Sequence, residues 1–114
     1  MIVAGFGFRH EAPLASFQAA YAMTPGAEAF ATVAEKAPGL APFATATGLP
    51  LISVPRNQLE DRPGSPRIRT LFGTGSVAES AALAAAGPGS ILILARTRSP
   101  DGQVVIALAK GSKP

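Results

Sequence analysis

Apolar residues in this chain fall into short runs that alternate between a strand-like and a helix-like spacing. Residues 1–8 (MIVAGFGF) are apolar and interrupted by glycines, which predicts a buried strand that a second backbone or a ligand can approach closely. In the next segment Leu14, Phe17 and Tyr21 recur at helical spacing and form one apolar stripe. The turn-forming residues 24–26 (TPG) end this predicted helix.

A second strand and a second helix follow in the same order. Residues 28–33 (EAFATV) predict the strand. Further along, Leu40 and Phe43 share a helical face, and Gly48 suits the C-terminal cap of that helix. Pro42 has no N–H to donate inside a helix, so it limits how early this helix can begin.

The middle of the chain is interrupted by prolines. Residues 49–54 (LPLISV) predict a third strand. Residues 55–69 contain three prolines and one glycine and predict mostly loop, with a single helical turn at residues 57–60. Residues 70–72 (TLF) predict a short strand that leads into a glycine-rich turn.

The last third of the chain predicts a helix and a hairpin. Residues 77–86 (VAESAALAAA) form the helix, which Gly87 stops. Residues 90–95 and 103–109 predict two strands, and the Pro-Asp-Gly between them is a turn signature, so we expect a hairpin. The tail, residues 110–114, is expected to fray.

Strands that alternate with helices and end in a hairpin predict an α/β fold. We expect residues 1–114 to form a single compact three-layer domain, with a largely parallel sheet, helices on both faces and a C-terminal antiparallel hairpin at one edge. Ligands bind such sheets outside the carboxyl ends of the strands. The loops to inspect are therefore residues 7–11, 35–39, 55–57 and 73–76.

Charge narrows the choice of partner. The chain has 10 Lys and Arg against 7 Asp and Glu, a formal net charge of +3 and a pI near 10.0, which favours an anionic partner. We expect no nucleic acid, because Tyr21 is the single Tyr and the phenylalanines fall mostly on apolar faces, so bases have no stacking platform. No apolar run reaches the roughly 18 to 20 residues of a membrane span, no cysteine is present, and the start lacks a basic leader, so we expect a cytoplasmic location.

The stretch GTGS before the last helix has two interpretations. Ser76 and Glu79 have the spacing of a capping box, in which Ser76 caps the helix and Glu79 returns a bond to it. A glycine turn before a helix can instead bind an anion. The stretch lacks the Lys-Ser/Thr pair of a phosphate-binding loop, so we read Gly73 and Gly75 as clearance for a broad, flat ligand.

Few residues suggest catalysis. His10 is the single histidine, and the carboxylates show no paired spacing on one helix face, so the weak catalytic candidates are His10, Glu79 and Ser76. We expect no metal and no cofactor. Arg9, at the exit of the first strand, could clamp a carboxylate in a bidentate pair. Further arginines lie in or beside loops at positions Arg56, Arg67, Arg69, Arg96 and Arg98.

Three stretches, in this order, resemble a cobalamin-biosynthesis family that includes CobE and the C-terminal domain of CbiG. They are GFGFR, TVAEKAPGLAPFATATGLPL, and GTGSVAESAAL before the hairpin ILILAR…QVVIALA, and the resemblance covers nearly the whole chain. It places the family's opening glycines and arginine on Gly5, Gly7 and Arg9, its lysine on Lys36 and its helix-start motif on residues 73–83.

The resemblance implies a function. CbiG opens a lactone ring of cobalt-precorrin-5A in the anaerobic route to vitamin B12, but this chain resembles only its C-terminal part and looks like the CobE of the aerobic route. We therefore expect a protein that binds or hands over a corrinoid or precorrin intermediate, with other pathway enzymes as possible partners. The alternative is a hydrolase or isomerase acting on a precorrin. The expected ligand-binding residues are Gly5, Gly7, Arg9, Lys36, Gly73, Thr74, Gly75 and Ser76.

Overall fold

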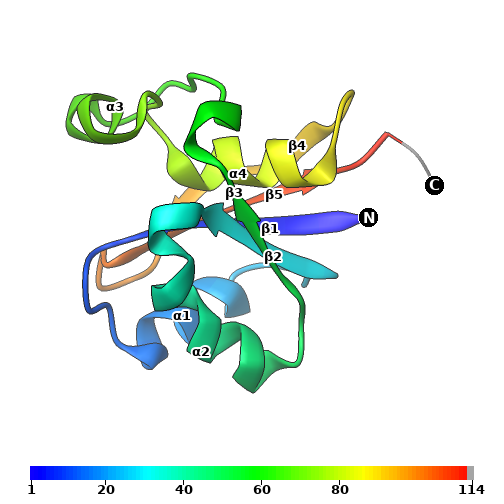
Figure 1. Ribbon diagram of the computed structural model, residues 1–114. Coiled ribbons are helices and arrows are strands. Elements are labelled where there is room, and N and C mark those ends of the chain that lie inside the picture. The colour runs from blue at the N-terminus through cyan, green and yellow to red at the C-terminus, as the bar shows by residue number, and fades with distance from the viewer. Residues whose placement is uncertain (113–114) are drawn as a thin grey trace.

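A five-stranded mixed sheet forms the centre of the protein (Figure 1). The structure is a computed structural model and describes residues 1–112. The strands are β1 (Ile2–Phe8), β2 (Ala29–Val33), β3 (Leu51–Val54), β4 (Ile91–Arg98) and β5 (Val104–Lys110). The helices are α1 (Leu14–Ala22), α2 (Ala37–Thr47), α3 (Pro66–Phe72) and α4 (Val77–Ala86), with short 3-10 turns η1 (Ala34–Lys36) and η2 (Arg56–Gln58).

The strand order is β3-β2-β1-β5-β4. β1 pairs in parallel with β2, and β2 with β3, whereas β5 runs antiparallel to both β1 and β4. The carboxyl ends of β1, β2, β3 and β4 therefore lie at one edge of the sheet. This confirms the predicted α/β class, with one correction: the antiparallel strand β5 is interior, because it pairs with β1 through the side that the hairpin leaves free, and β4 forms the edge.

Helices α1 and α2 cover one face of the sheet with an aromatic core (Figure 1). Phe6 on β1 and Phe30 on β2 meet edge to face at 4.9 Å between ring centroids, and Phe43 of α2 stacks on Phe30 at 5.2 Å. Phe17 of α1 completes the group, and all four side chains are buried. Although the chain has few aromatic residues, most of them gather in this layer, where they fix α1 and α2.

Helix α4 covers the opposite face with small side chains. A Cβ added at Gly5 would lie 2.0 Å from the carbonyl oxygen of Ala78 and 2.7 Å from the backbone nitrogen of Ala82, so the helix rests directly on β1. Ala78, Ala81 and Ala82 are buried in this contact. The alanine run thus allows a close helix-to-strand approach, and its predicted bounds, residues 77–86, match α4.

Two predicted elements differ from the structure. Residues 70–72 were expected to be a strand but form the end of α3: the Ser65 side chain caps this helix and Gly73, at φ 77°, ends it. Helix α2 begins at Ala37, earlier than Pro42 led us to expect. Pro42 is tolerated because the carbonyl that loses its N–H partner belongs to the exposed Pro38, where water can reach it.

The first part of the predicted tail is hydrogen-bonded to the sheet. Lys110, expected to fray, pairs with Ile2 and Ile91 as the last residue of β5, and the Gly111 N–H donates to the Met1 carbonyl at 3.0 Å. The Ser112 hydroxyl donates to the Pro88 carbonyl at 3.1 Å, and residues 113–114 of the predicted tail lie outside the described residues. No helix within residues 1–112 is long and apolar enough to cross a membrane.

Candidate ligand-binding site

The carboxyl ends of the first three strands bring Phe8, Lys36 and Arg56 together. Phe8 ends β1, Lys36 ends η1 directly after β2, and Arg56 begins η2 after β3. The Lys36 Nζ donates to the Phe8 carbonyl oxygen at 2.5 Å and lies 4.8 Å from the centroid of the Phe8 ring. This is the edge at which the topology predicted a ligand site.

Phe72, from the end of α3, completes this group. Its ring centroid lies 5.7 Å from the Lys36 Nζ and 5.3 Å from the Arg56 Cζ, so two cations contact one ring. Glu35 lies beside them, 3.9 Å from the Arg56 Nη1. We call Phe8, Lys36, Arg56 and Phe72 the edge cluster.

Lys36 is half-buried and lacks a carboxylate partner among residues 1–112. Burial lowers the pKa of Lys36 from its usual 10.5. Its ammonium carries three donors, of which the hydrogen bond to Phe8 uses one. Lys36 can therefore still bind an anion.

Gly7, Arg9 and Gly73, all predicted as ligand residues, border the edge cluster. Gly7 is half-buried just before Phe8, and Gly73 follows Phe72 with open space where a side chain would be. Arg9 is exposed, its backbone N–H donates to the Gln103 carbonyl at 3.0 Å, and its guanidinium makes no ion pair within the described chain. These three residues and Lys36 are the part of the predicted set that is not buried.

The other four predicted ligand residues are buried and contact other parts of the chain. Gly5 faces α4, as described above, and offers no clearance to a ligand. Thr74 is fully buried: its hydroxyl accepts from the Arg62 N–H at 2.9 Å and lies 2.8 Å from the Ser80 hydroxyl. A Cβ at Gly75 would lie 2.6 Å from the Gly64 nitrogen, and Ser76 is buried at the start of α4.

The capping box forms only in part. The Ser76 hydroxyl accepts from the Glu79 N–H at 3.2 Å, as predicted. Glu79 does not return a bond: its carboxylate, with 4% of the side chain exposed, accepts from the Arg62 Nε at 3.3 Å and from the Arg96 N–H at 2.9 Å. The Ser76 N–H donates to Thr74 instead. The Glu79 carboxylate therefore binds Arg62 and Arg96 and does not complete the capping box. Through these two residues it connects α4 to β4 and to the segment before α3.

The weak catalytic candidates do not assemble into a site. The His10 side chain is 95% exposed, and its charged neighbour is Glu11 at 4.0 Å. Ser76 and Glu79 are both engaged in holding α4, and no hydrogen bond of the described chain joins them to His10. Residues 1–112 contain no group of three or more His, Asp or Glu side chains placed to hold a metal.

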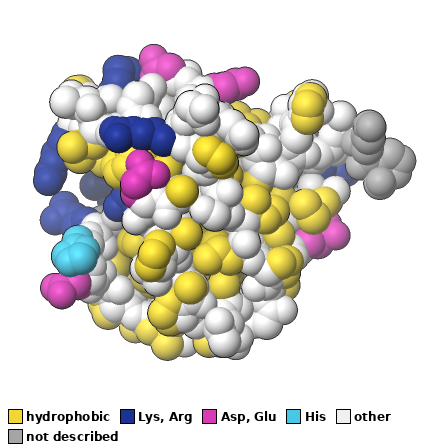
Figure 2. Space-filling view, in the orientation of Figure 1, with side chains coloured by type: hydrophobic (Ala, Val, Ile, Leu, Met, Phe, Trp, Pro, Cys, Tyr) yellow, Lys and Arg dark blue, Asp and Glu magenta, His cyan; other side chains and the backbone are white. Residues whose placement is uncertain are grey.

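Lys and Arg side chains gather on one side of the surface. Figure 2 shows most of the visible ones on the left of the view, where β1 ends and α3 projects in Figure 1. Sequence reasoning had placed the arginines in loops but could not say which of them meet. It placed Phe8 in a strand, as the structure confirms, but it placed Phe72 in a strand where the structure has the end of α3.

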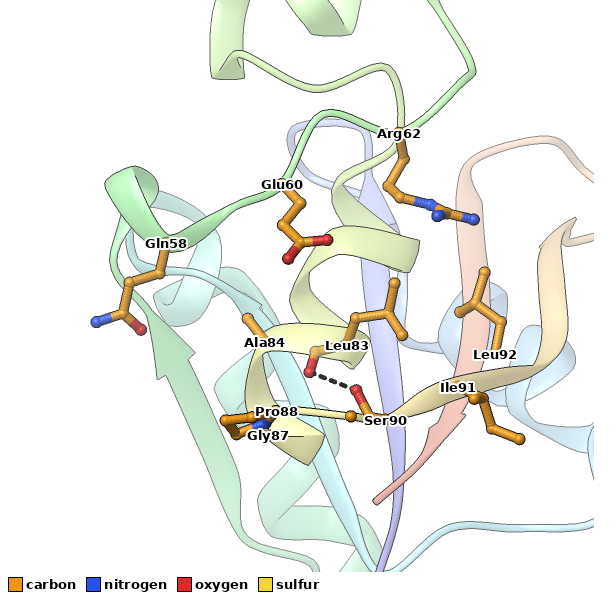
Figure 3. A pocket seen from close by; sticks show the side chains of 11 residues that line it. Gln58, Glu60, Arg62, Leu83, Ala84, Gly87, Pro88, Ser90, Ile91 and Leu92 are labelled. Carbon is orange, nitrogen blue, oxygen red and sulfur yellow. Dashed lines mark hydrogen bonds between the residues drawn. The ribbon is translucent and has the colours of Figure 1, made fainter. Parts of the chain in front are cut away.

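A separate groove of about 660 Å³ runs beside α4 (Figure 3). Leu83 and Leu92 provide apolar lining, and Glu60 and Arg62 lie over it. We call this the α4 groove. It shares no lining residue with the edge cluster, and the Arg62 guanidinium at its rim is already paired with Glu79.

The fold and the edge cluster define a small α/β domain that presents charged and aromatic side chains at the carboxyl end of its sheet. The chain belongs to the family described as "Cobalamin synthesis G C-terminus", which matches residues 2–109. It is a cobalamin biosynthesis protein of the CbiG and CobE type, as the motifs in its sequence suggested. No curated protein matches the chain in sequence.

Two solved structures are similar over almost the whole chain. The cobalamin biosynthesis protein chiG from Agrobacterium tumefaciens strain C58 shares 32% identity at a TM-score of 0.77, with 99% of this chain and 100% of that chain covered. CobE, a protein from the cobalamin (vitamin B12) biosynthetic pathway, shares 25% identity at a TM-score of 0.83, with 99% and 95% covered.

Proposed function

We propose that this protein binds a corrinoid or precorrin intermediate at the edge cluster and holds it or hands it over, without changing it chemically. The observation that carries the proposal is the meeting of Lys36 and Arg56 with two aromatic rings at the carboxyl ends of the strands, in a member of a cobalamin synthesis family. By its likeness to CobE we assign the protein to the aerobic route, in the cytoplasm, with other pathway enzymes as its partners.

The chemistry of the ligand suits these side chains. Corrin precursors are flat macrocycles that carry many carboxylates. Lys36, Arg56 and the exposed Arg9 offer charge-assisted hydrogen bonds to carboxylates, and Phe8 and Phe72 offer apolar surface to the ring system. A phosphate ligand is less well served, because the start of α4, where a phosphate would bind, is buried and capped by Ser76.

The proposal is tested by titrating the protein with hydrogenobyrinic acid and following the absorption of the macrocycle. Lys36→Ala and Arg9→Ala should each weaken binding by about 10- to 100-fold, the worth of one charge-assisted hydrogen bond. Lys110→Ala is the matched control, because Lys110 is exposed at the opposite end of the sheet. The absence of both a spectral shift and co-elution at micromolar protein would overturn the proposal.

An enzyme that acts on a precorrin is the second candidate, and membership of a family named for cobalamin synthesis supports it. Mass spectrometry separates the two. A precorrin that keeps its mass and absorption spectrum after incubation with the protein supports binding, whereas turnover into a new species supports an enzyme. His10→Ala is informative here because the exposed His10 can be removed without disturbing the fold.

A further inference from the structure

Helix α3 belongs to a closed loop that projects from the sheet. The loop spans residues 64–75, and we call it the α3 lobe. At its base the Ser65 N–H donates to the Gly75 carbonyl at 2.8 Å, and the Gly75 N–H donates to the Arg62 carbonyl at 2.9 Å. Gly64 and Gly75 are in direct contact, since a Cβ at Gly64 would lie 2.1 Å from the Gly75 oxygen. The two ends of the lobe are therefore fastened together.

Beyond its base the lobe has little support. None of the α3 residues is buried, Leu71 is 46% exposed, and Figure 1 shows the helix standing clear of the sheet. Phe72 is the residue of α3 that contacts both Lys36 and Arg56. A helix without a fully buried residue contributes little to the core, so its sequence is free to serve the ligand side of the edge cluster.

The two cations have separate origins and weak partners. Lys36 follows β2 and Arg56 follows β3, and both are long, flexible side chains. The ion pair between Arg56 and Glu35 is long, at 3.9 Å, and both side chains are about half exposed. A ligand carboxylate could replace Glu35 at little cost, because an exposed ion pair of this kind is weak.

We infer that Phe72 is a positioning residue, whose ring holds the Lys36 ammonium and the Arg56 guanidinium together as a paired anchor for two carboxylates of one polycarboxylate ligand. Each cation is attracted to the aromatic ring, and the ring is placed by the fastened base of the α3 lobe. The identity of the ligand as a carboxylated macrocycle rests on the proposed function. The positioning of the cations by Phe72 does not.

The test compares two substitutions that differ in the ring. Phe72→Leu keeps an apolar side chain and removes the aromatic face, whereas Phe72→Tyr keeps the face. With hydrogenobyrinic acid as the ligand, Phe72→Leu should weaken binding about tenfold and Phe72→Tyr by less than about twofold. Lys36→Ala should cost less in the Phe72→Leu background than in the wild type, because the two residues act together. Equal affinity of wild type and Phe72→Leu would overturn the inference.

A second measurement needs no ligand. The side-chain proton resonances of Arg56 should be displaced by the Phe72 ring current in the wild type and in Phe72→Tyr, and should return to ordinary positions in Phe72→Leu. Circular dichroism should show all three folded, because Phe72 is only half-buried. Arg56 resonances that are unchanged by Phe72→Leu would contradict the inference. If the wild type binds no ligand while Arg56 shifts as expected, the proposed function fails and the positioning role stands.

Discussion

Lys36 is the residue on which most of the edge cluster depends. Its ammonium contacts Phe8, which packs on Phe17 of the core at 4.9 Å, and Phe72, which belongs to the α3 lobe. Lys36 therefore connects the core to the projecting helix. The resemblance to a known family singled out this lysine, but its aromatic surroundings depend on two segments that are 28 and 36 residues away in sequence, and no local pattern reports them.

The lowered pKa of Lys36 makes ligand binding sensitive to alkaline pH. Burial favours the neutral amine. As pH rises, Lys36 therefore loses the charge that attracts a carboxylate before the pH reaches 10.5. The affinity of the wild type for hydrogenobyrinic acid should fall as Lys36 loses its charge at alkaline pH. Lys36→Arg should hold its affinity to higher pH, since a guanidinium keeps its proton there. Arg56 and Glu35 are the other charged groups at the cluster, and both residues are present in the wild type and in Lys36→Arg. Identical pH dependences for the two proteins would contradict this account.

Asp101 organises the hairpin turn through its carboxylate. It accepts from the Ser99 hydroxyl at 2.7 Å, from the Gln103 N–H at 3.1 Å and from the Ser16 hydroxyl on α1. These hydrogen bonds, of which the one from Ser16 counts most, lower the pKa of Asp101 from 3.8 to about 2. The turn is thereby joined to helix α1.

The lowered pKa of Asp101 defines the pH range in which its carboxylate stabilises the fold. Because the pKa is lower in the folded chain, the stabilisation is complete above 3.8 and is lost as pH falls through about 2. Asp101→Asn should melt at a lower temperature than the wild type at neutral pH, and the difference should shrink as the solution is acidified. Thermal melts across this range check it, and a difference that is constant with pH would be the contrary result.

At the scale of elements, the apolar runs predicted all five strands of the sheet and the helices α1, α2 and α4. Helix α3 was missed because residues 63–66 carry two prolines, which we read as breaking any helix, whereas Pro66 stands in the first turn, where a missing N–H costs nothing. The packing of α4 was also not visible in the sequence. The spacing of glycines in β1 indicates that something comes close, and only the structure shows that it is a helix and not a ligand.

The close contact between β1 and α4 gives a matched pair of substitutions. Gly5→Ala would place a methyl group 2.0 Å from the Ala78 oxygen. Because this oxygen belongs to the backbone, it cannot move away by a side-chain rotation. We expect a loss of about 1–3 kcal/mol in the free energy of unfolding, as for other overpacked sites. Gly7→Ala meets its nearest atom at 3.7 Å and should be close to neutral. Urea denaturation measures both, and equal stabilities would show that α4 does not rest on Gly5 as described.

At the scale of the whole molecule, the residues that pack the two faces of the sheet are separate from the cations at its carboxyl edge. One face of the sheet is held by an aromatic core, the other by alanines, and the carboxyl ends of the strands present the cations. That a site should lie at this edge followed from the alternation of strands and helices. Which residues form it did not: Gly5 packs against α4, Ser76 caps that helix, and Thr74 and Gly75 contact residues 62–64. These are tertiary contacts, or a cap, that leave no periodic signal in the sequence.

The central claim is that the edge cluster, and not the α4 groove, receives the ligand. The most direct measurement is the change in backbone amide resonances of isotopically labelled protein on titration with hydrogenobyrinic acid. Our account predicts that the largest changes fall on residues 7–9, 35–37, 56–58 and 72–73. Largest changes around Leu83 and Leu92 in the α4 groove, or no changes at all at saturating ligand, would contradict it.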